Sequence, residues 1–222
     1  MNHKIKGSIG AILSLSLLFA GCSAPVVNTD PIEGTLNVVA TTTMLADLST
    51  VIGGERVAVN GLMGPGIDPH LYQASAGDVS LMQTADVVVY NGLHLEGKMG
   101  EIFENLTGQG LAVICIEDGL DESKLLAWEE DSSVHDPHIW FDTSLWKDAA
   151  KTVATGFSQA DPGGKATYEA NLDAYLEELD ETDTYIRNRA AELPEAQRVL
   201  VTAHDAFQYF GKAYGFEVRG LQ

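Results

Sequence analysis

Three of the six histidines in the 222-residue chain have neighbours that suit a metal ligand. His70 and His138 each follow directly on an Asp-Pro pair, and His204 comes just after the β-branched run 199–202. A proline in front of a histidine restricts the backbone and helps to fix where the ring points. Neutral imidazole is the commonest ligand of zinc in proteins and also binds manganese and iron. These three histidines are therefore the candidate metal ligands.

A purely structural explanation of the same pattern competes with this one. Asp-Pro pairs commonly start turns, and a single histidine in a loop is more often a surface residue than a ligand. An acid stands beside each of the three histidines: Asp68, Asp136 and Asp205. Each acid could orient the neighbouring ring through a hydrogen bond, or could only cap a helix or form a turn.

Motifs of the common enzyme classes do not occur in the sequence. There is no HExxH, no GxSxG and no phosphate-binding GxxxxGK[ST], so the chain is not the ATPase of a transporter. His94 and His135 stay ambiguous as ligands, and the tryptophans Trp128, Trp140 and Trp146 are interpreted as packing residues. A zinc metallohydrolase is the main alternative, because three histidines around zinc with one open position also describe catalytic sites.

Short β-rich runs alternate with helical stretches along the chain. Strands are predicted at 36–41, 57–63, 87–90, 111–116, 199–202 and 217–218, and helices at 44–52, 76–85, 98–106, 144–157, 165–193 and 205–214. This alternation predicts an α/β fold with parallel sheets covered on both faces. In open α/β sheets, ligands bind beyond the carboxyl ends of the strands, and all three candidate histidines could lie there.

One predicted helix is unusually long. Residues 165–193 contain no Gly or Pro, which predicts a single helix of about 40 Å at 1.5 Å per residue. Asp161-Pro162 in front of it is a typical helix start. A helix of this length would suit a rigid strut between two lobes. The acidic stretch 117–137, by contrast, predicts a long loop.

The N-terminal residues predict export and anchoring. Lys4 and Lys6 precede the apolar run 9–20, which is too short to span a bilayer but is typical of a signal peptide, here residues 1–21. The residues around Gly21-Cys22 resemble a bacterial lipobox, so Cys22 is the predicted lipidation site. Residues 22–35 are polar and lack periodicity, which is typical of a flexible tether. The protein is therefore expected outside the cytoplasm, anchored to the bacterial membrane.

Charge and cysteine content exclude two further classes. The formal net charge is −19, and nucleic-acid binding requires clustered Lys and Arg, so nucleic acid is excluded as a partner. Apart from Cys22 the only cysteine is Cys115, within the apolar run 111–116. One remaining cysteine makes neither an intrachain disulfide nor a Cys-rich metal site, and Cys115 is predicted to lie in the core.

Three segments carry a family resemblance. They are Gly66-Ile67-Asp68-Pro69-His70-Leu71-Tyr72, Asp136-Pro137-His138-Ile139-Trp140-Phe141-Asp142 and Val201-Thr202-Ala203-His204-Asp205-Ala206-Phe207-Gln208-Tyr209-Phe210. With them the chain, from about residue 36 to its last, resembles the zinc and manganese solute-binding lipoproteins of ABC importers, the TroA-like group. Some members were first described as adhesins, so cell adhesion is a further alternative.

The resemblance implies a fold and a function. It implies an N-terminal α/β lobe at 36–160, a linking helix at 161–194 and a C-terminal α/β lobe that begins at 195 and is incomplete at 222, with the metal between the lobes. His70 and His138 would be ligands from the first lobe and His204 from the second, with an acidic fourth ligand expected beyond residue 222. The protein would be a monomer and no enzyme. It would deliver its metal to the integral-membrane permease of the importer.

The resemblance leaves the choice between Zn(II) and Mn(II) as the transported ligand open. Members that prefer manganese often have glutamate where this chain has His204. Members dedicated to zinc often carry a histidine-rich loop before the second ligand, whereas the corresponding residues 126–134 are acidic and contain no histidine.

Overall fold

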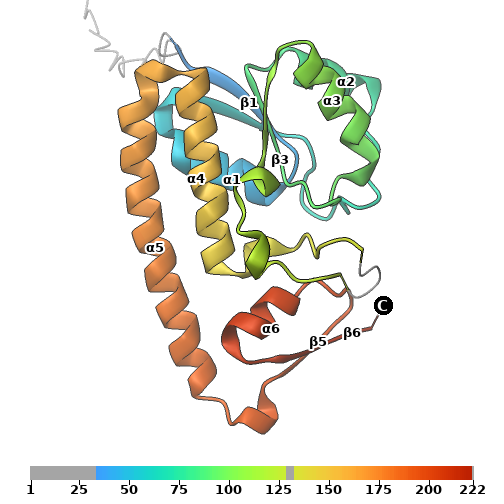
Figure 1. Cartoon of the computed structure of the whole chain (residues 1–222), viewed down its shortest axis with the longest axis vertical. Helices are drawn as coiled ribbons and strands as arrows, with labels where there is room; N and C mark the ends of the chain where they lie inside the picture. Colours follow the sequence, from blue (N-terminus) through green and yellow to red (C-terminus); the bar gives the residue numbers. More distant parts are fainter. Residues whose placement is uncertain (1–33, 129–132, 222) are drawn as a thin grey trace, which may run out of the picture. The chain divides into compact units, whose positions relative to one another are not determined.

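The main sheet of the computed structural model has four parallel strands in the order β2-β1-β3-β4. They are β1 (Leu36–Ala40), β2 (Val57–Gly61), β3 (Val87–Tyr90) and β4 (Ala112–Cys115). The structure describes residues 34–128 and 133–221 (Figure 1). The predicted signal peptide, Cys22 and nearly all of the predicted tether lie outside the described residues.

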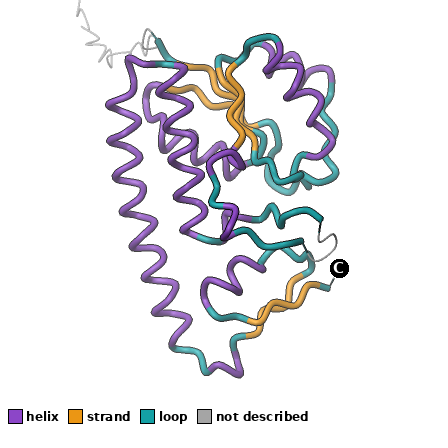
Figure 2. Tube along the Cα trace, viewed as in Figure 1, coloured by secondary structure: helices purple, strands orange, loops and turns teal. Residues whose placement is uncertain are grey.

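Side chains that alternate along the strands bury both faces of the sheet. Val38 and Val87 face one side, where they pack against α1 (Thr43–Gly53), α4 (Thr143–Ala160) and α5 (Lys165–Ala191). Val39 and Val88 face the other side and pack against α2 (Ala76–Gln83) and α3 (Gly100–Gly108). Figure 2 shows the helices on the two sides of the strands. Because both faces of the sheet are buried, the strand sequences are mostly apolar and do not alternate between apolar and polar residues.

The junction between α4 and α5 is fixed by a partly buried cluster around Asp161. The backbone N–H of Asp161 donates to the carbonyl of Phe157 and ends α4. Its carboxylate accepts from Arg56 Nε at 2.8 Å and from the Tyr168 hydroxyl at 2.8 Å. Burial opposes ionisation of Asp161, but the hydrogen bonds from Arg56 and Tyr168 outweigh it and lower the pKa of the carboxyl. The Asp-Pro pair thus sets the turn from which the long α5 runs beside α4 (Figure 1).

A smaller parallel pair, β5 (Val199–Thr202) and β6 (Glu217–Gly220), follows α5 and is connected by α6 (Gln208–Tyr214). Helix α6 ends at Gly215, which has a left-handed φ of 75° that suits glycine. Gly211 is required for packing, because a Cβ there would lie 2.6 Å from the Val218 side chain. Helix α6 contacts both α5 and the segment Ile139–Phe141.

The predicted fold class, an α/β fold with a parallel sheet and one long helix, is confirmed. Several element bounds differ by one to three residues; the last helix, for example, begins at Gln208 rather than 205. The predicted loop 117–137 contains short 3₁₀ turns at Ile116–Gly119 and Glu122–Lys124. Cys115 is buried, as expected. Within the described part of the chain, no helix is both long and apolar enough to cross a membrane. The boundaries of the two lobes and the linking helix remain a prediction.

Candidate metal centre

The Nε2 atoms of the three predicted histidines meet at one point. Nε2 of His138 lies 3.2 Å from Nε2 of His70 and 3.2 Å from Nε2 of His204. In the described residues, these three side chains form the only group of three or more His, Cys, Asp or Glu with ligand atoms all within 4.8 Å of one another. The structure therefore brings together residues that are 68 and 66 positions apart in the sequence.

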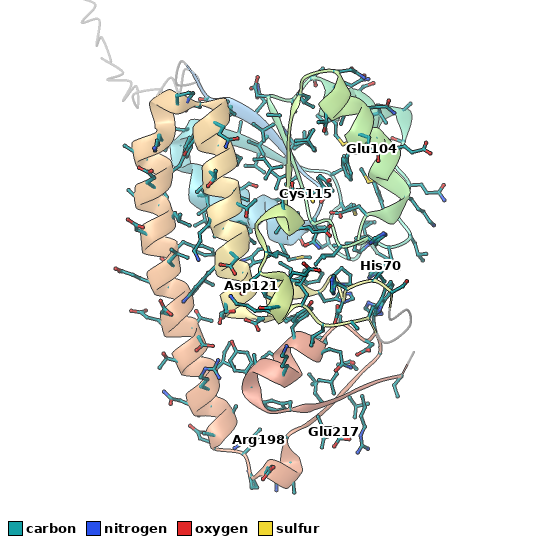
Figure 3. The ribbon with its side chains drawn as sticks, viewed as in Figure 1. His70, Glu104, Cys115, Asp121, Arg198 and Glu217 are labelled. Atoms are coloured by element: carbon teal, nitrogen blue, oxygen red, sulfur yellow. The ribbon has the colours of Figure 1, made fainter. Side chains whose placement is uncertain are left out.

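His70 reaches this point from the loop between β2 and α2. Asp68 forms the turn, because its Oδ1 accepts the backbone N–H of His70 at 2.9 Å. The neighbouring Gly66 has a left-handed φ of 82°, which lets the chain reverse here. In Figure 3, His70 lies between the main sheet and the β5–α6 segment. Its loop is largely exposed, with Leu71 at 66%.

His138 is buried and held from two sides. Asp136 Oδ1 accepts the backbone N–H of His138 at 2.9 Å and lies 2.7 Å from the ring Nδ1. A carboxylate on Nδ1 fixes the tautomer that leaves Nε2 free to bind a metal. Of the three acids singled out in the sequence, Asp136 is the one that hydrogen-bonds its histidine ring in this way.

His204 follows the carboxyl end of β5, where the strand delivers it beside the other two rings. Its ring stands nearly perpendicular to that of His138, with the ring centroids 5.1 Å apart. The adjacent Asp205 is buried, and its carboxylate accepts from Gln208 Nε2 at 2.8 Å. Asp205 therefore contacts the first residue of α6 through its side chain, but it does not cap the helix, whose N-cap is Phe207 without a side-chain cap hydrogen bond.

Two tryptophans lie against the histidine rings, which the sequence did not indicate. Trp128 stacks on His70 with a centroid distance of 5.6 Å and an interplanar angle of 22°. Trp140 meets His138 edge-on at 5.3 Å. The packing interpretation holds for Trp146, which is buried in the core.

The remaining candidates lie outside the cluster. His94 is exposed in the loop after β3, where its φ of 63° is left-handed. His135 is half-buried in the stretch that precedes His138, and its Nδ1 has no hydrogen-bond partner. Neither histidine belongs to the metal-type group found among the described residues.

A buried carboxylate connects the sheet to the loop of His138. Glu96 Oε1 accepts from the Thr41 hydroxyl at 2.6 Å and from the backbone N–H of Asn91 at 2.9 Å. Asn91 in turn donates from Nδ2 to the carbonyl of Pro137 at 3.2 Å. Burial raises the pKa of Glu96 despite the hydrogen bonds it accepts. The sequence does not indicate this link; its only local signal is an acid next to the apolar Leu95.

The geometry fits a small divalent ion. Zinc with Zn–N bonds of about 2.05 Å in tetrahedral coordination separates two ligand nitrogens by about 3.3 Å. The two Nε2 separations of 3.2 Å are close to that value. The three rings line a cleft of ≈ 480 Å³ with largely apolar walls, which include Met44, Trp140, Phe141 and Ala206. Three imidazole donors in such a cleft can hold a divalent ion.

Known proteins are similar to this chain in sequence and in fold. The chain is 47% identical over 190 residues to the "Zinc-binding protein TroA" of Treponema pallidum (strain Nichols). The aligned residues cover 86% of this chain and 61% of that protein. It is 41% identical over 217 residues to the "Manganese-binding lipoprotein MntA" of Bacillus subtilis (strain 168), covering 98% of this chain and 70% of that protein. The chain thus spans less than two thirds of the length of the Treponema relative.

A solved structure agrees with this relationship. The structure titled as the periplasmic zinc-binding protein TroA from Treponema pallidum matches with a TM-score of 0.80 at 48% identity, over 85% of this chain and 67% of that one. The family described as "Zinc-uptake complex component A periplasmic" matches residues 38–222. Because that match takes in the whole described fold except its first few residues, the chain belongs to this zinc-uptake component A family, as the resemblance predicted.

Proposed function

We propose that this chain captures Zn(II) or Mn(II) outside the cytoplasm and delivers it to the permease of an ABC importer. The observation that carries the proposal is the meeting of three histidine Nε2 atoms at 3.2 Å separations. His70, His138 and His204 are the proposed ligands, and the ion is cargo rather than a resident cofactor.

The relatives support the choice of ion. One is named for zinc and the other for manganese, and both are similar in sequence to this chain over most of its length. Imidazole binds both ions, and affinity at nitrogen sites generally rises from manganese towards zinc. We therefore expect Zn(II) to bind more tightly to the three histidines than Mn(II).

The proposal includes a partner and a location. The family description names a component of an uptake complex, and the Bacillus relative is named a lipoprotein. The partner would be the integral-membrane permease, and the chain would be held at the membrane through Cys22, acting as a monomer. Replacement of Cys22 by serine should release the protein from the membrane, as fractionation would detect. Equal membrane retention of both forms would contradict the anchor.

Metal binding is tested by competitive titration of the metal-free protein with Zn(II) and Mn(II), with elemental analysis of the loaded form. Single replacement of each proposed ligand by alanine should weaken Zn(II) binding more than tenfold, about 1.4 kcal/mol. His94→Ala is the matched control, because His94 is an exposed loop histidine outside the cluster. Equal Zn(II) affinities of all four variants would show that the metal site does not lie in this cleft.

The same samples distinguish transport from catalysis. A metallohydrolase would also place zinc on three histidines with an open position, but it would turn over substrate. We expect the zinc-loaded protein to show no metal-dependent activity on a panel of ester, peptide and phosphate substrates. Hydrolysis that disappears in His138→Ala would favour the enzyme instead.

A further inference from the structure

Tyr209 reaches from α6 into the part of the molecule that holds His138. Its side chain is fully buried and packs in the core cluster that contains the β1 and β3 side chains. Burial raises the pKa of Tyr209 to about 12, so the hydroxyl stays protonated and can both donate and accept. The hydroxyl accepts from the backbone N–H of Leu126 at 3.1 Å and donates to the carbonyl of Asp136 at 2.9 Å.

These two backbone groups belong to neighbouring antiparallel arms, 126–128 and 133–136. Trp128 N–H donates to the carbonyl of Val134 at 3.0 Å, and Asp136 N–H donates to the carbonyl of Leu126 at 2.9 Å. A regular antiparallel ladder would add the reciprocal bond from Leu126 N–H to the Asp136 carbonyl. The Tyr209 hydroxyl replaces that bond, because it is inserted between its two partners. The spacing of the arms at this point therefore depends on a residue from α6.

The arms carry the groups that contact two of the three proposed ligands. Asp136 fixes the ring of His138 through Nδ1 at 2.7 Å, and Trp128 stacks on His70. The third ligand, His204, stands five positions before Tyr209 in the same β5–α6 connection. One hydroxyl thus connects the segment of His204 to the supports of His138 and His70.

We infer that Tyr209 is a positioning residue of the metal centre, which sets Asp136, and through it His138, relative to His204. The inference rests on the proposed metal-binding function and adds a residue that makes no contact with the ion. A small displacement of Asp136 would turn the His138 ring, whose Nε2 is the nitrogen closest to both other ligands. Loss of supporting contacts around ligands typically weakens metal binding 10- to 100-fold.

The test is Tyr209→Phe, which keeps the buried ring and removes only the hydroxyl. The matched control is Tyr214→Phe on the same helix, where a buried hydroxyl donates to Asp183 at 3.2 Å, away from the arms. Competitive Zn(II) titration, visible absorption of the Co(II)-loaded protein and thermal unfolding of the metal-free protein are measured for both variants and the unsubstituted chain. The Co(II) spectrum reports coordination geometry, which a merely structural role would leave unchanged.

We expect Tyr209→Phe to weaken Zn(II) binding about tenfold and to change the Co(II) spectrum, while Tyr214→Phe changes neither. In the Asp136→Asn background, Tyr209→Phe should weaken Zn(II) binding by less than a further threefold. The reason is that Tyr209 acts on the metal centre through Asp136. If Tyr209→Phe lowers the unfolding midpoint but matches Tyr214→Phe in affinity and spectrum, the inference is overturned and the proposed function stands. If the unsubstituted chain takes up no Zn(II), both are overturned.

Discussion

Two Asp-Pro-His loops have the same local sequence and the same turn, yet they hold their histidines differently. In each, the aspartate Oδ1 accepts the backbone N–H of the histidine at 2.9 Å. Asp136 and His138 are 1% and 2% exposed, whereas Asp68 is exposed and His70 is half-buried. Asp136 also bonds the ring of its histidine at 2.7 Å. The local sequence therefore sets the turn, and burial decides whether the aspartate of the turn also contacts the histidine ring.

We expect the two loops to take different parts in the proposed metal binding. His138 is held by Asp136, and its loop is tied to β3 through Asn91, so its Nε2 is a fixed reference point. His70 stands on a largely exposed loop with Trp128 against its ring. We expect His138 to supply a preorganised ligand, and His70 to adjust when ions of different size bind.

The largest expected effect is the removal of a ligand ring. His138→Ala should weaken Zn(II) binding at least 100-fold, because it removes the central nitrogen and leaves a cavity in a buried wall. His70→Ala should weaken Zn(II) binding at least tenfold, but less than His138→Ala does, since the loop of His70 is exposed and water can replace the ring. Competitive titration compares the two. A greater loss in His70→Ala would reverse the assignment of fixed and adjustable ligand.

The next effect concerns the aspartates. Asp136→Asn should weaken Zn(II) binding about tenfold, because an amide polarises the His138 ring less than a carboxylate does. Asp68→Asn should change the affinity less than threefold, since asparagine forms the same turn with the backbone N–H of His70. Titration of both variants under identical buffer conditions checks the difference. Equal losses would mean that the ring contact of Asp136 contributes nothing.

A smaller effect is expected from the aromatic contacts. Trp128→Leu should weaken Zn(II) binding about threefold, in line with about 0.5–1.5 kcal/mol for an aromatic pair. Trp140→Leu should cost less, because Asp136 already orients the His138 ring that Trp140 touches. Unfolding of the metal-free variants, followed by circular dichroism, separates loss of packing from loss of positioning. The idea fails if Trp140→Leu is the more damaging change at equal stability.

No effect on metal affinity is expected at a third Asp-Pro pair, Asp161-Pro162. Asp161→Asn should leave Zn(II) binding unchanged but lower the unfolding midpoint by about 4 °C, since it weakens the contacts with Arg56 and Tyr168. The folded state lowers the pKa of Asp161, so its contribution to stability is present above the unfolded value of about 3.9. That contribution should disappear as the pH falls through the lower, folded pKa. Thermal unfolding between pH 7 and pH 3 measures it, and an Asn variant with the same acid sensitivity as the parent would contradict it.

The sequence alone determined the local structure and the identity of the candidate ligands. Short β-rich runs between helical stretches predicted the parallel strands, and β3, which is buried on both faces, is the most continuously apolar of them. The absence of Gly and Pro from 165–193 predicted α5. The Asp-Pro-His repeats predicted His70 and His138, and the position after a strand predicted His204. Each of these signals acts within a few residues along the chain.

Only the tertiary structure decided how these residues work together. His70, His138 and His204 meet across 68 and 66 positions, and no local pattern shows that their rings come together. The choice of Asp136 over Asp68 as ring support depends on burial by neighbouring segments. The insertion of Tyr209 between two backbone groups likewise follows from the packing of α6 against the core. Such contacts depend on how the helices and the sheet pack. The side chains that make them lie far apart in the sequence, where the periodicity of a helix or strand does not predict which residues meet.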